Sequence, residues 1–298
     1  MKELDSKHNF LGIGKEFSNY KDSQIVILQV PLEKTVSYGK GTHNGPKEII
    51  TASHFVEYYD EEQSRELCFE KGICSLSPLT FEKLSIRKSC DKIYNEILKC
   101  INDKKFVVVL GGEHSLTTAS VKAHNEKYSN LSILHFDAHS DLRESYDDSP
   151  YSHACFMARV MNVFPPSRVT QVGIRAQCIE EAQFIKENNV KTFYASAIRR
   201  GLHGQDWQKK IVDTLSQQIY VSFDVDYFDP AIMPSTGTPE PDGFLYSETL
   251  DIFREIVKSG KQIIGLDVVE LAPIKDLHHS DLTAARLLYK ILNFAFRL

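Results

Sequence analysis

Short apolar runs alternate with amphipathic stretches along most of the chain. The apolar runs predict buried strands at 24–30, 106–110, 131–136, 169–172, 191–194, 219–223 and 262–266. Stretches with apolar positions three or four residues apart predict helices at 46–59, 80–102, 113–128, 155–162, 179–187, 207–215, 247–258 and 281–298. This strand–helix alternation predicts an α/β fold in which helices cover both faces of a mainly parallel sheet.

The same pattern bears on the domain organisation. Residues 1–23 are polar and show no clear periodicity, so we expect an irregular N-terminal arm. Residues 60–79 are charged, and no element can be assigned to them. No shift in composition marks a second domain within the 298 residues, so we expect 24–298 to form a single domain. Thr80 and Asp281 are the expected N-caps of two of the helices.

Composition and charge exclude several classes of function. The formal net charge is −5, and Lys and Arg are scattered rather than clustered, so nothing supports nucleic-acid binding. No apolar run approaches the length of a membrane span, and the N-terminus carries no apolar signal region. The six cysteines form no Cys-x-x-Cys pair, which favours free thiols in a reducing compartment and a cytoplasmic location.

Acidic and imidazole side chains follow four of the predicted strands. In chain order they are His114, then Asp137, His139 and Asp141, then Asp224 and Asp226, and finally Asp267 and Glu270. The carboxyl ends of parallel strands converge at one edge of a sheet, where ligands bind. Capping or solvated turns would explain one or two of these groups but not all four.

The chemistry of these groups indicates a metal centre. Six of them form the candidate ligand set: His114, Asp137, His139, Asp141, Asp224 and Asp226. Six ligands exceed the need of one tetrahedral ion, and four carboxylates would balance two divalent cations. We therefore expect a binuclear centre with its ions about 3.5–4 Å apart. An oxygen-rich set without thiolate suits Mn²⁺ best, although the spacing leaves other divalent ions open.

The motifs around these groups resemble those of the ureohydrolases, the family of arginase and agmatinase. They read Gly-Gly-Glu-His at 111–114, Asp-Ala-His-Ser-Asp at 137–141, Asp-x-Asp-x-x-Asp-Pro at 224–230 and Gly-x-Asp-Val-Val-Glu at 265–270. Glu113 is a departure, because many members have Asp there. The resemblance implies a three-layer α/β/α, arginase-like fold and a homo-oligomer, a trimer or hexamer.

The resemblance also implies roles for individual residues. His114, Asp137, Asp141 and Asp224 would enclose one of two Mn²⁺ ions, and Asp137, His139, Asp224 and Asp226 the other. A hydroxide bridging the ions would attack the guanidino carbon, with Asp141 handling its proton and Glu270 orienting the guanidinium. His153 would protonate the leaving amine, although the sequence alone favours a surface histidine at a helix start. His135 is expected to pack in the core or behind the ligands.

The substrate is expected to be a small guanidino compound. The loop at 142–153 lacks the Asn/Ser/Thr-rich arginase pattern and resembles that of agmatinases, which predicts hydrolysis of agmatine to putrescine and urea. Glu144, Asp147 and Asp148 would suit a terminal amine, whereas Arg143 could hold a carboxylate. The alternatives are formimidoylglutamase, guanidinobutyrase, arginase and aminopropylagmatine ureohydrolase. A catalytically silent binding protein would be expected to have lost ligands, and none is missing.

Overall fold

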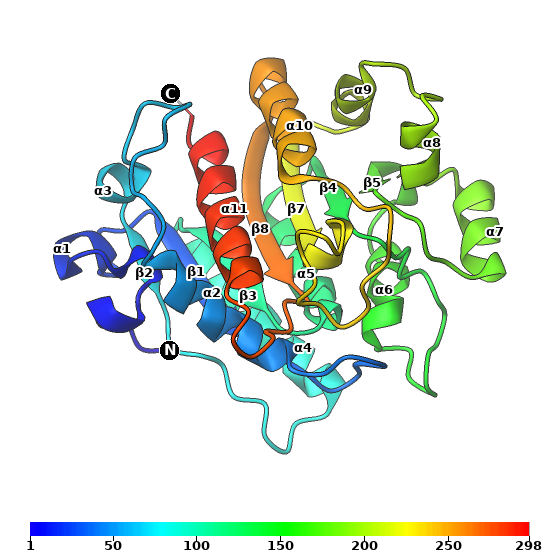
Figure 1. The fold of residues 1–298 in the computed structure, drawn as a ribbon. Coiled ribbons are helices and arrows are strands. Elements are labelled where there is room, and N and C mark those ends of the chain that lie inside the picture. Colours follow the sequence, from blue (N-terminus) through cyan, green and yellow to red (C-terminus); the bar gives the residue numbers. More distant parts are fainter. Residues whose placement is uncertain (298) are drawn as a thin grey trace.

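An eight-stranded sheet runs through the centre of the molecule (Figure 1), in a computed structural model that describes residues 1–297. The strand order is β2-β1-β3-β8-β7-β4-β5-β6, and every neighbouring pair is parallel. The strands are β1 (Ile25–Val30), β2 (Ile73–Ser75), β3 (Phe106–Gly111), β4 (Leu131–Phe136), β5 (Val169–Val172), β6 (Lys191–Phe193), β7 (Gln218–Asp224) and β8 (Gln262–Val269). The predicted mainly parallel α/β fold is confirmed.

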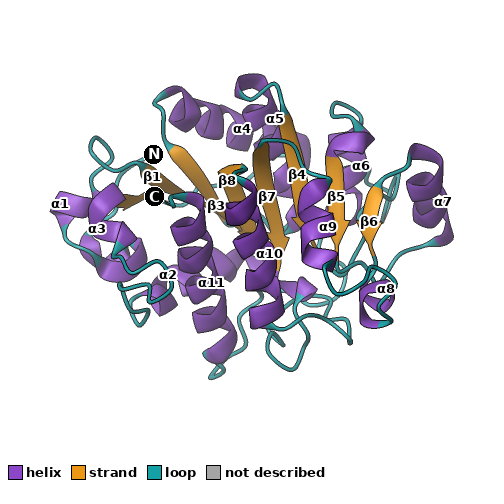
Figure 2. Cartoon of the chain, turned by 90° about the horizontal axis from the view of Figure 1, so that it is seen from above, coloured by secondary structure: helices purple, strands orange, loops and turns teal. Residues whose placement is uncertain are grey.

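Helices cover both faces of the sheet (Figure 2). On one face lie α4, α5 and α6, and on the other lie α2, α11, α10 and α9. The helices are α1 (Lys15–Ser18), α2 (Gly45–Ser53), α3 (Leu67–Lys71), α4 (Ile86–Asn102), α5 (Thr117–Lys127), α6 (Phe156–Met161), α7 (Ile179–Asn188), α8 (Ala195–Arg199), α9 (Trp207–Asp213), α10 (Tyr246–Ser259) and α11 (His279–Ala295). No helix within residues 1–297 is long and apolar enough to cross a membrane.

Several predicted helix ends are wrong. The long helix α4 begins after Ser85, whose Oγ accepts a hydrogen bond from the Lys88 N–H, and not at Thr80. Apolar residues continue upstream of Ser85, so the periodic pattern runs past the true start. Similarly, α2 ends at Ser53 instead of 59, and Asp281 lies inside α11 rather than capping it. The predicted continuation of α11 to residue 298 lies outside the described residues.

Strand β8 is longer than predicted, and this changes the place of Asp267. The apolar run ends at Leu266, but the strand continues to Val269, so Asp267 lies within it and pairs in register with Ser222 of β7. Three hydroxyl groups donate hydrogen bonds to its buried carboxylate, which allows a charged residue to sit inside a central strand.

The first 23 residues fold against the body of the protein. Phe10 and Leu11 are buried in the same hydrophobic cluster as Ile49 and Ile73. The Asn9 side chain donates to the Ile73 carbonyl oxygen at 3.1 Å, which attaches this segment to the edge strand β2. The segment contains the short helix α1 and is anchored to the sheet, and a domain boundary at residue 24 stays a prediction.

Candidate metal centre and active site

The candidate site lies where the four central strands end. β3, β8, β7 and β4 are consecutive neighbours in the sheet, and each is followed by members of the predicted ligand and catalytic set. Their carboxyl ends meet at one edge because all neighbouring pairs are parallel. The topology therefore brings together groups that lie far apart in the sequence, such as His114 and Glu270, which are 156 residues apart.

One cluster surrounds the Nδ1 atom of His114. This atom lies 3.1 Å from Asp137 Oδ2, 3.1 Å from Asp224 Oδ2 and 3.7 Å from Asp141 Oδ2. All four residues are buried. Three carboxylates and an imidazole nitrogen thus converge on one point, and these are the residues for which the first metal position is a prediction.

A second cluster surrounds His139. Its Nδ1 lies 2.9 Å from Asp226 Oδ2 and 3.5 Å from Asp137 Oδ1. Asp137 therefore contributes one oxygen to each cluster. Backbone N–H groups fix the remaining oxygens: Ala138 donates to Asp226 Oδ1 at 3.0 Å, and Asp226 donates to Asp224 Oδ1 at 2.8 Å.

The donor atoms of the two clusters fit divalent cations. Asp226 Oδ2 is buried and finds no hydrogen-bond partner among the described residues, although a buried carboxylate oxygen normally has one. The donor set is four carboxylates and two imidazoles without a thiolate, which suits Mn²⁺ and similar ions. The ligand identities remain a prediction that metal analysis can test.

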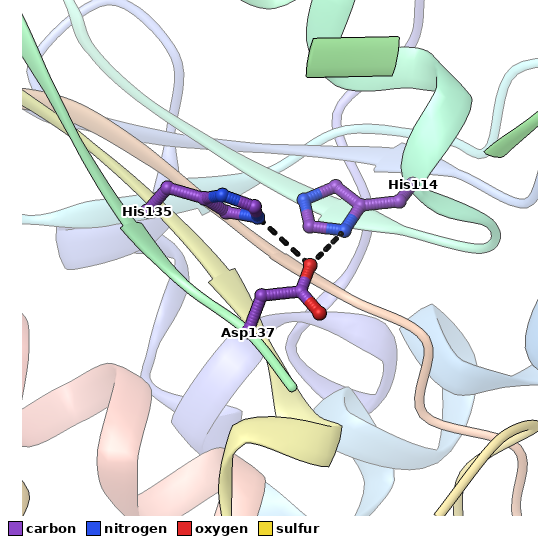
Figure 3. Close-up of side chains that lie close together, drawn as sticks. All are labelled: His114, His135 and Asp137. Atoms are coloured by element: carbon purple, nitrogen blue, oxygen red, sulfur yellow. Dashed lines mark hydrogen bonds and ion pairs between the residues drawn. The ribbon is translucent and has the colours of Figure 1, made fainter. Parts of the chain in front are cut away.

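His135 and His114 both point at the same oxygen of Asp137 (Figure 3), but His135 acts as a donor. Its Nε2 lies 2.8 Å from Asp137 Oδ2. On the other side of the ring, the Gln171 side-chain amide donates to His135 Nδ1 at 3.1 Å and to the Ser140 carbonyl oxygen at 2.9 Å. Since Nδ1 accepts, the proton must reside on Nε2 and point at Asp137. His135 therefore orients a candidate ligand from behind.

Crowding of like charges controls the protonation of the site. Burial raises the pKa of Asp141 and Asp224 well above the usual value, and neighbouring carboxylates add to this effect. Burial also raises the pKa of Glu270 to about 8. Burial alone would lower the pKa of His114, but Asp137 and Asp141 raise it to about 9. Cations at this point would favour ionised carboxylates and displace the imidazolium proton.

Two candidate site residues have left-handed backbones. Asp141 has φ +53° and Glu270 has φ +64°, a conformation that is uncommon for residues other than glycine. Glu270 Oε1 accepts a hydrogen bond from the backbone N–H of His114 at 2.6 Å. Such conformations cost energy, so the contacts around both residues must hold them in place.

A cavity of about 490 Å³ opens onto both clusters. Asp141, Asp224, Glu270 and His153 line it, so the predicted acid faces the same space as the predicted ligands. His153 is therefore placed at the site and not on an outer surface, in agreement with the resemblance.

The acidic side chains of the loop at 142–153 do not face this cavity. Glu144 is exposed and pairs with Arg159, while Asp147 and Asp148 form an exposed turn with positive φ. None of the three lines the cavity. The prediction that they would attract the amine of the substrate is therefore not supported, because sequence proximity to Asp141 does not determine which way a loop side chain points.

Two other carboxylates, those of Glu240 and Glu181, line the cavity instead. The Oε1 atom of Glu240 lies 4.0 Å from His139 Nε2. The Oε2 atom of Glu181 lies 4.0 Å from the Nε atom of Arg143, which also lines the cavity. Arg175 donates to the carbonyl oxygens of Asp226 at 2.7 Å and Glu240 at 2.9 Å, and so ties the loop bearing Glu240 to the metal site.

Some supporting residues could not be singled out from the sequence. Ser222 lies 2.9 Å from His114 Nε2 and shares strand parity with Asp224, which is a signal that could have identified it. Gln171 and Thr35 come from distant segments, and no local pattern marks them. Asp267 stands out in the sequence as an acidic residue after an apolar run. That run ends at Leu266, so it does not reveal that Asp267 lies inside the strand.

Comparisons with known proteins agree with this geometry. The model described as "Arginase family" matches residues 23–293. The N(1)-aminopropylagmatine ureohydrolase of Synechocystis sp. is 36% identical over 303 residues, covering 98% of this chain and 97% of that protein. The agmatinase of Bacillus cereus is 35% identical over 274 residues, covering 90% of each. The crystal structure of agmatine ureohydrolase of Thermoplasma volcanium aligns with TM-score 0.85 at 27% identity, covering 100% of this chain and 95% of that one.

Proposed function

This chain belongs to the arginase family, and we propose that it is an agmatinase that hydrolyses agmatine to putrescine and urea. The observation that supports this most strongly is the cavity in which both candidate metal clusters, Glu270 and His153 meet. Manganese as the metal, a cytoplasmic location and an assembly of three or six copies belong to the same proposal.

The metal site is proposed to comprise the two clusters described above. His114, Asp141 and Asp224 belong to one, His139 and Asp226 to the other, and Asp137 contributes to both. Asp224 is proposed as a further ligand of the second ion. When bound, two Mn²⁺ ions supply Lewis acidity that makes water a nucleophile near neutral pH. His135 and the backbone N–H groups fix the carboxylates that would otherwise rotate.

The remaining chemistry falls to three side chains. Glu270 is buried and would pair with the guanidinium of the substrate, whose positive charge lowers the pKa of the carboxyl from about 8. Asp141 would accept the proton of the attacking water. His153 would deliver a proton to the leaving amine, which otherwise departs as an unstable anion. Cleavage of the carbon–nitrogen bond then releases urea and the amine.

The wall of the cavity favours a substrate with a cationic tail. Glu240 presents a carboxylate there, and Glu181 partly balances the positive charge of Arg143. The cavity wall is therefore charged, and it does not form a strong binding site for a carboxylate tail. N1-aminopropylagmatine is the second candidate, because it carries an additional amine and the Synechocystis relative is named for it.

A substrate panel tests the proposal. Protein stripped with a chelator and reloaded with Mn²⁺ would be assayed for urea from agmatine, N1-aminopropylagmatine, guanidinobutyrate and arginine, and for formamide from formimidoylglutamate. We expect agmatine to have the highest kcat/KM, and the chelated protein to be inactive. Asp224→Ala is the matched control, because loss of a shared ligand should abolish product release from this site.

The preferred substrate in the panel decides between the candidate functions. A preference for N1-aminopropylagmatine would favour the second candidate, whereas a preference for arginine, guanidinobutyrate or formimidoylglutamate would contradict the proposed substrate class. Absence of Mn²⁺-dependent product from every compound would contradict the proposed reaction.

A further inference from the structure

His153 is contacted at both its backbone and its ring by hydroxyl groups. Its backbone N–H donates to Thr35 Oγ1 at 2.9 Å. Its ring Nδ1 lies 3.5 Å from the same oxygen and 3.3 Å from Ser152 Oγ. Two hydroxyls therefore lie beside Nδ1, and Nε2 has no hydrogen-bond partner among the described residues.

Glu113 fixes the position of Thr35. This carboxylate is fully buried, and its Oε2 accepts from the backbone N–H groups of Lys34 at 2.7 Å and Thr35 at 2.6 Å. Its Oε1 accepts from Ser115 Oγ at 2.6 Å. Because Glu113 directly precedes His114, it connects the turn that carries a candidate metal ligand to the residue that contacts His153.

The segment around Thr35 is held at further points. We call residues 33–43 the strap. Glu33 Oε2 accepts from the backbone N–H groups of Gly41 at 3.0 Å and His43 at 2.9 Å. The Gly39 N–H donates to the Gly237 carbonyl oxygen at 3.0 Å, and a Cβ at Gly39 would lie only 2.8 Å from Gly237 Cα. The strap therefore has a defined path beside the site, where Ser37 lines the cavity.

These contacts suggest a role that the ligand and acid assignments do not cover. We propose that Thr35, held by Glu113, is a positioning residue that orients the His153 imidazole so that Nε2 faces the leaving nitrogen of the substrate. This rests on the proposed function, since it concerns the same reaction. A general acid works only when its proton lies within hydrogen-bond reach of the leaving group, so a small rotation of the ring reduces turnover.

Removal of the Thr35 hydroxyl tests the proposal. Thr35→Val keeps the shape of the side chain and removes both contacts, so we expect kcat for urea release to fall about tenfold to a hundredfold. KM and bound Mn²⁺ should be unchanged. Thr35→Ser restores the hydroxyl and should recover at least about half of kcat. Thr42→Val is the matched control, because Thr42 Oγ1 contacts Glu33 in the same strap and not His153.

A double-mutant cycle separates positioning from a general effect. In a His153→Ala background, Thr35→Val should cause no further loss, because the group it orients is gone. An equal loss in both backgrounds, an unchanged kcat in Thr35→Val, or loss of Mn²⁺ from that variant would overturn the proposal. If the unmodified protein released no urea from any guanidino compound, the proposed function would fail instead, which the panel above detects separately.

Discussion

The two ring nitrogens of His114 have different surroundings. Nε2 lies 2.9 Å from Ser222 Oγ, and Ser222 in turn donates its only hydroxyl proton to Asp267 Oδ1 at 2.8 Å. Ser222 Oγ must therefore accept from His114, which keeps a proton on Nε2. Phe156 stacks on the ring with centroids 3.9 Å apart. Nδ1 is thereby aimed at the carboxylates and can serve as a metal ligand once its own proton is displaced.

Loss of the Ser222 hydroxyl should weaken metal binding. We expect Ser222→Ala to reduce the Mn²⁺ affinity of the site held by His114 by about tenfold to a hundredfold, as is usual when a partner behind a ligand is removed. Free Mn²⁺ measured by electron paramagnetic resonance during a titration reports this directly. Thr117→Val is the control, because Thr117 donates to the other oxygen of Asp267 and leaves His114 untouched. Equal affinity in Ser222→Ala and the unmodified protein would show that the contact is dispensable.

At the residue scale, sequence could predict the groups that the sheet collects. His114, Asp137 and Asp224 each follow an apolar run, and parallel topology brings strand ends together. The residues that orient them were not predictable in this way. Thr35 and Gln171 reach the site only because of how distant segments cross, and one-dimensional spacing does not encode those crossings.

At the element scale, helix α5 packs on the sheet through a buried neutral histidine. His124 is fully buried; its Nδ1 donates to the Ser120 carbonyl oxygen at 2.8 Å, and Nε2 has no partner in the described chain. A Cβ at Gly265 of β8 would lie 2.3 Å from Nε2, so glycine is needed beneath the ring. Burial lowers the pKa of His124 from 6.5 to about 4.

This histidine should make the fold sensitive to acid. The unfolded chain binds a proton as pH falls through 6.5, whereas folded His124 resists protonation until about pH 4. The stability that neutral His124 contributes is therefore fully present above pH 6.5 and is lost as the pH falls. At pH 5 the free energy of unfolding should be lower by about 2 kcal/mol for this reason. In urea unfolding of metal-free protein, His124→Leu should show a shallower loss of stability between pH 7 and 5. Identical pH profiles for His124→Leu and the unmodified protein would refute this account.

Strands and helix ends differ in how well sequence predicts them. Six-residue strands such as β4 are buried along their whole length, so an uninterrupted apolar run marks them. Strand β2 has three residues, too few for a periodic signal, and it lies at the edge of the sheet. The start of α4 depends on one hydrogen bond at Ser85, while the apolar pattern continues through Phe81.

At the scale of the whole molecule, the N-terminal segment completes one side of the core. A polar average over residues 1–23 hides three apolar residues, Phe10, Leu11 and Ile13, that are at most 2% exposed. The Ser75 N–H of the edge strand donates to Asn9 Oδ1 at 2.7 Å, and the Phe10 N–H donates to Ser75 Oγ at 2.9 Å. The segment thus shields β2, which would otherwise present an open edge.

Truncation of Phe10 measures how much this segment contributes. Phe10 is fully buried, so Phe10→Ala should lower the free energy of unfolding by about 3–5 kcal/mol through lost apolar contact and the cavity left behind. Phe55 is 79% exposed, and Phe55→Ala should change the free energy of unfolding by no more than about 0.5 kcal/mol. Urea unfolding at neutral pH compares the two directly. If both variants unfolded at the same urea concentration, residues 1–23 would be a dispensable arm, and the edge of the sheet at β2 would be stable without them.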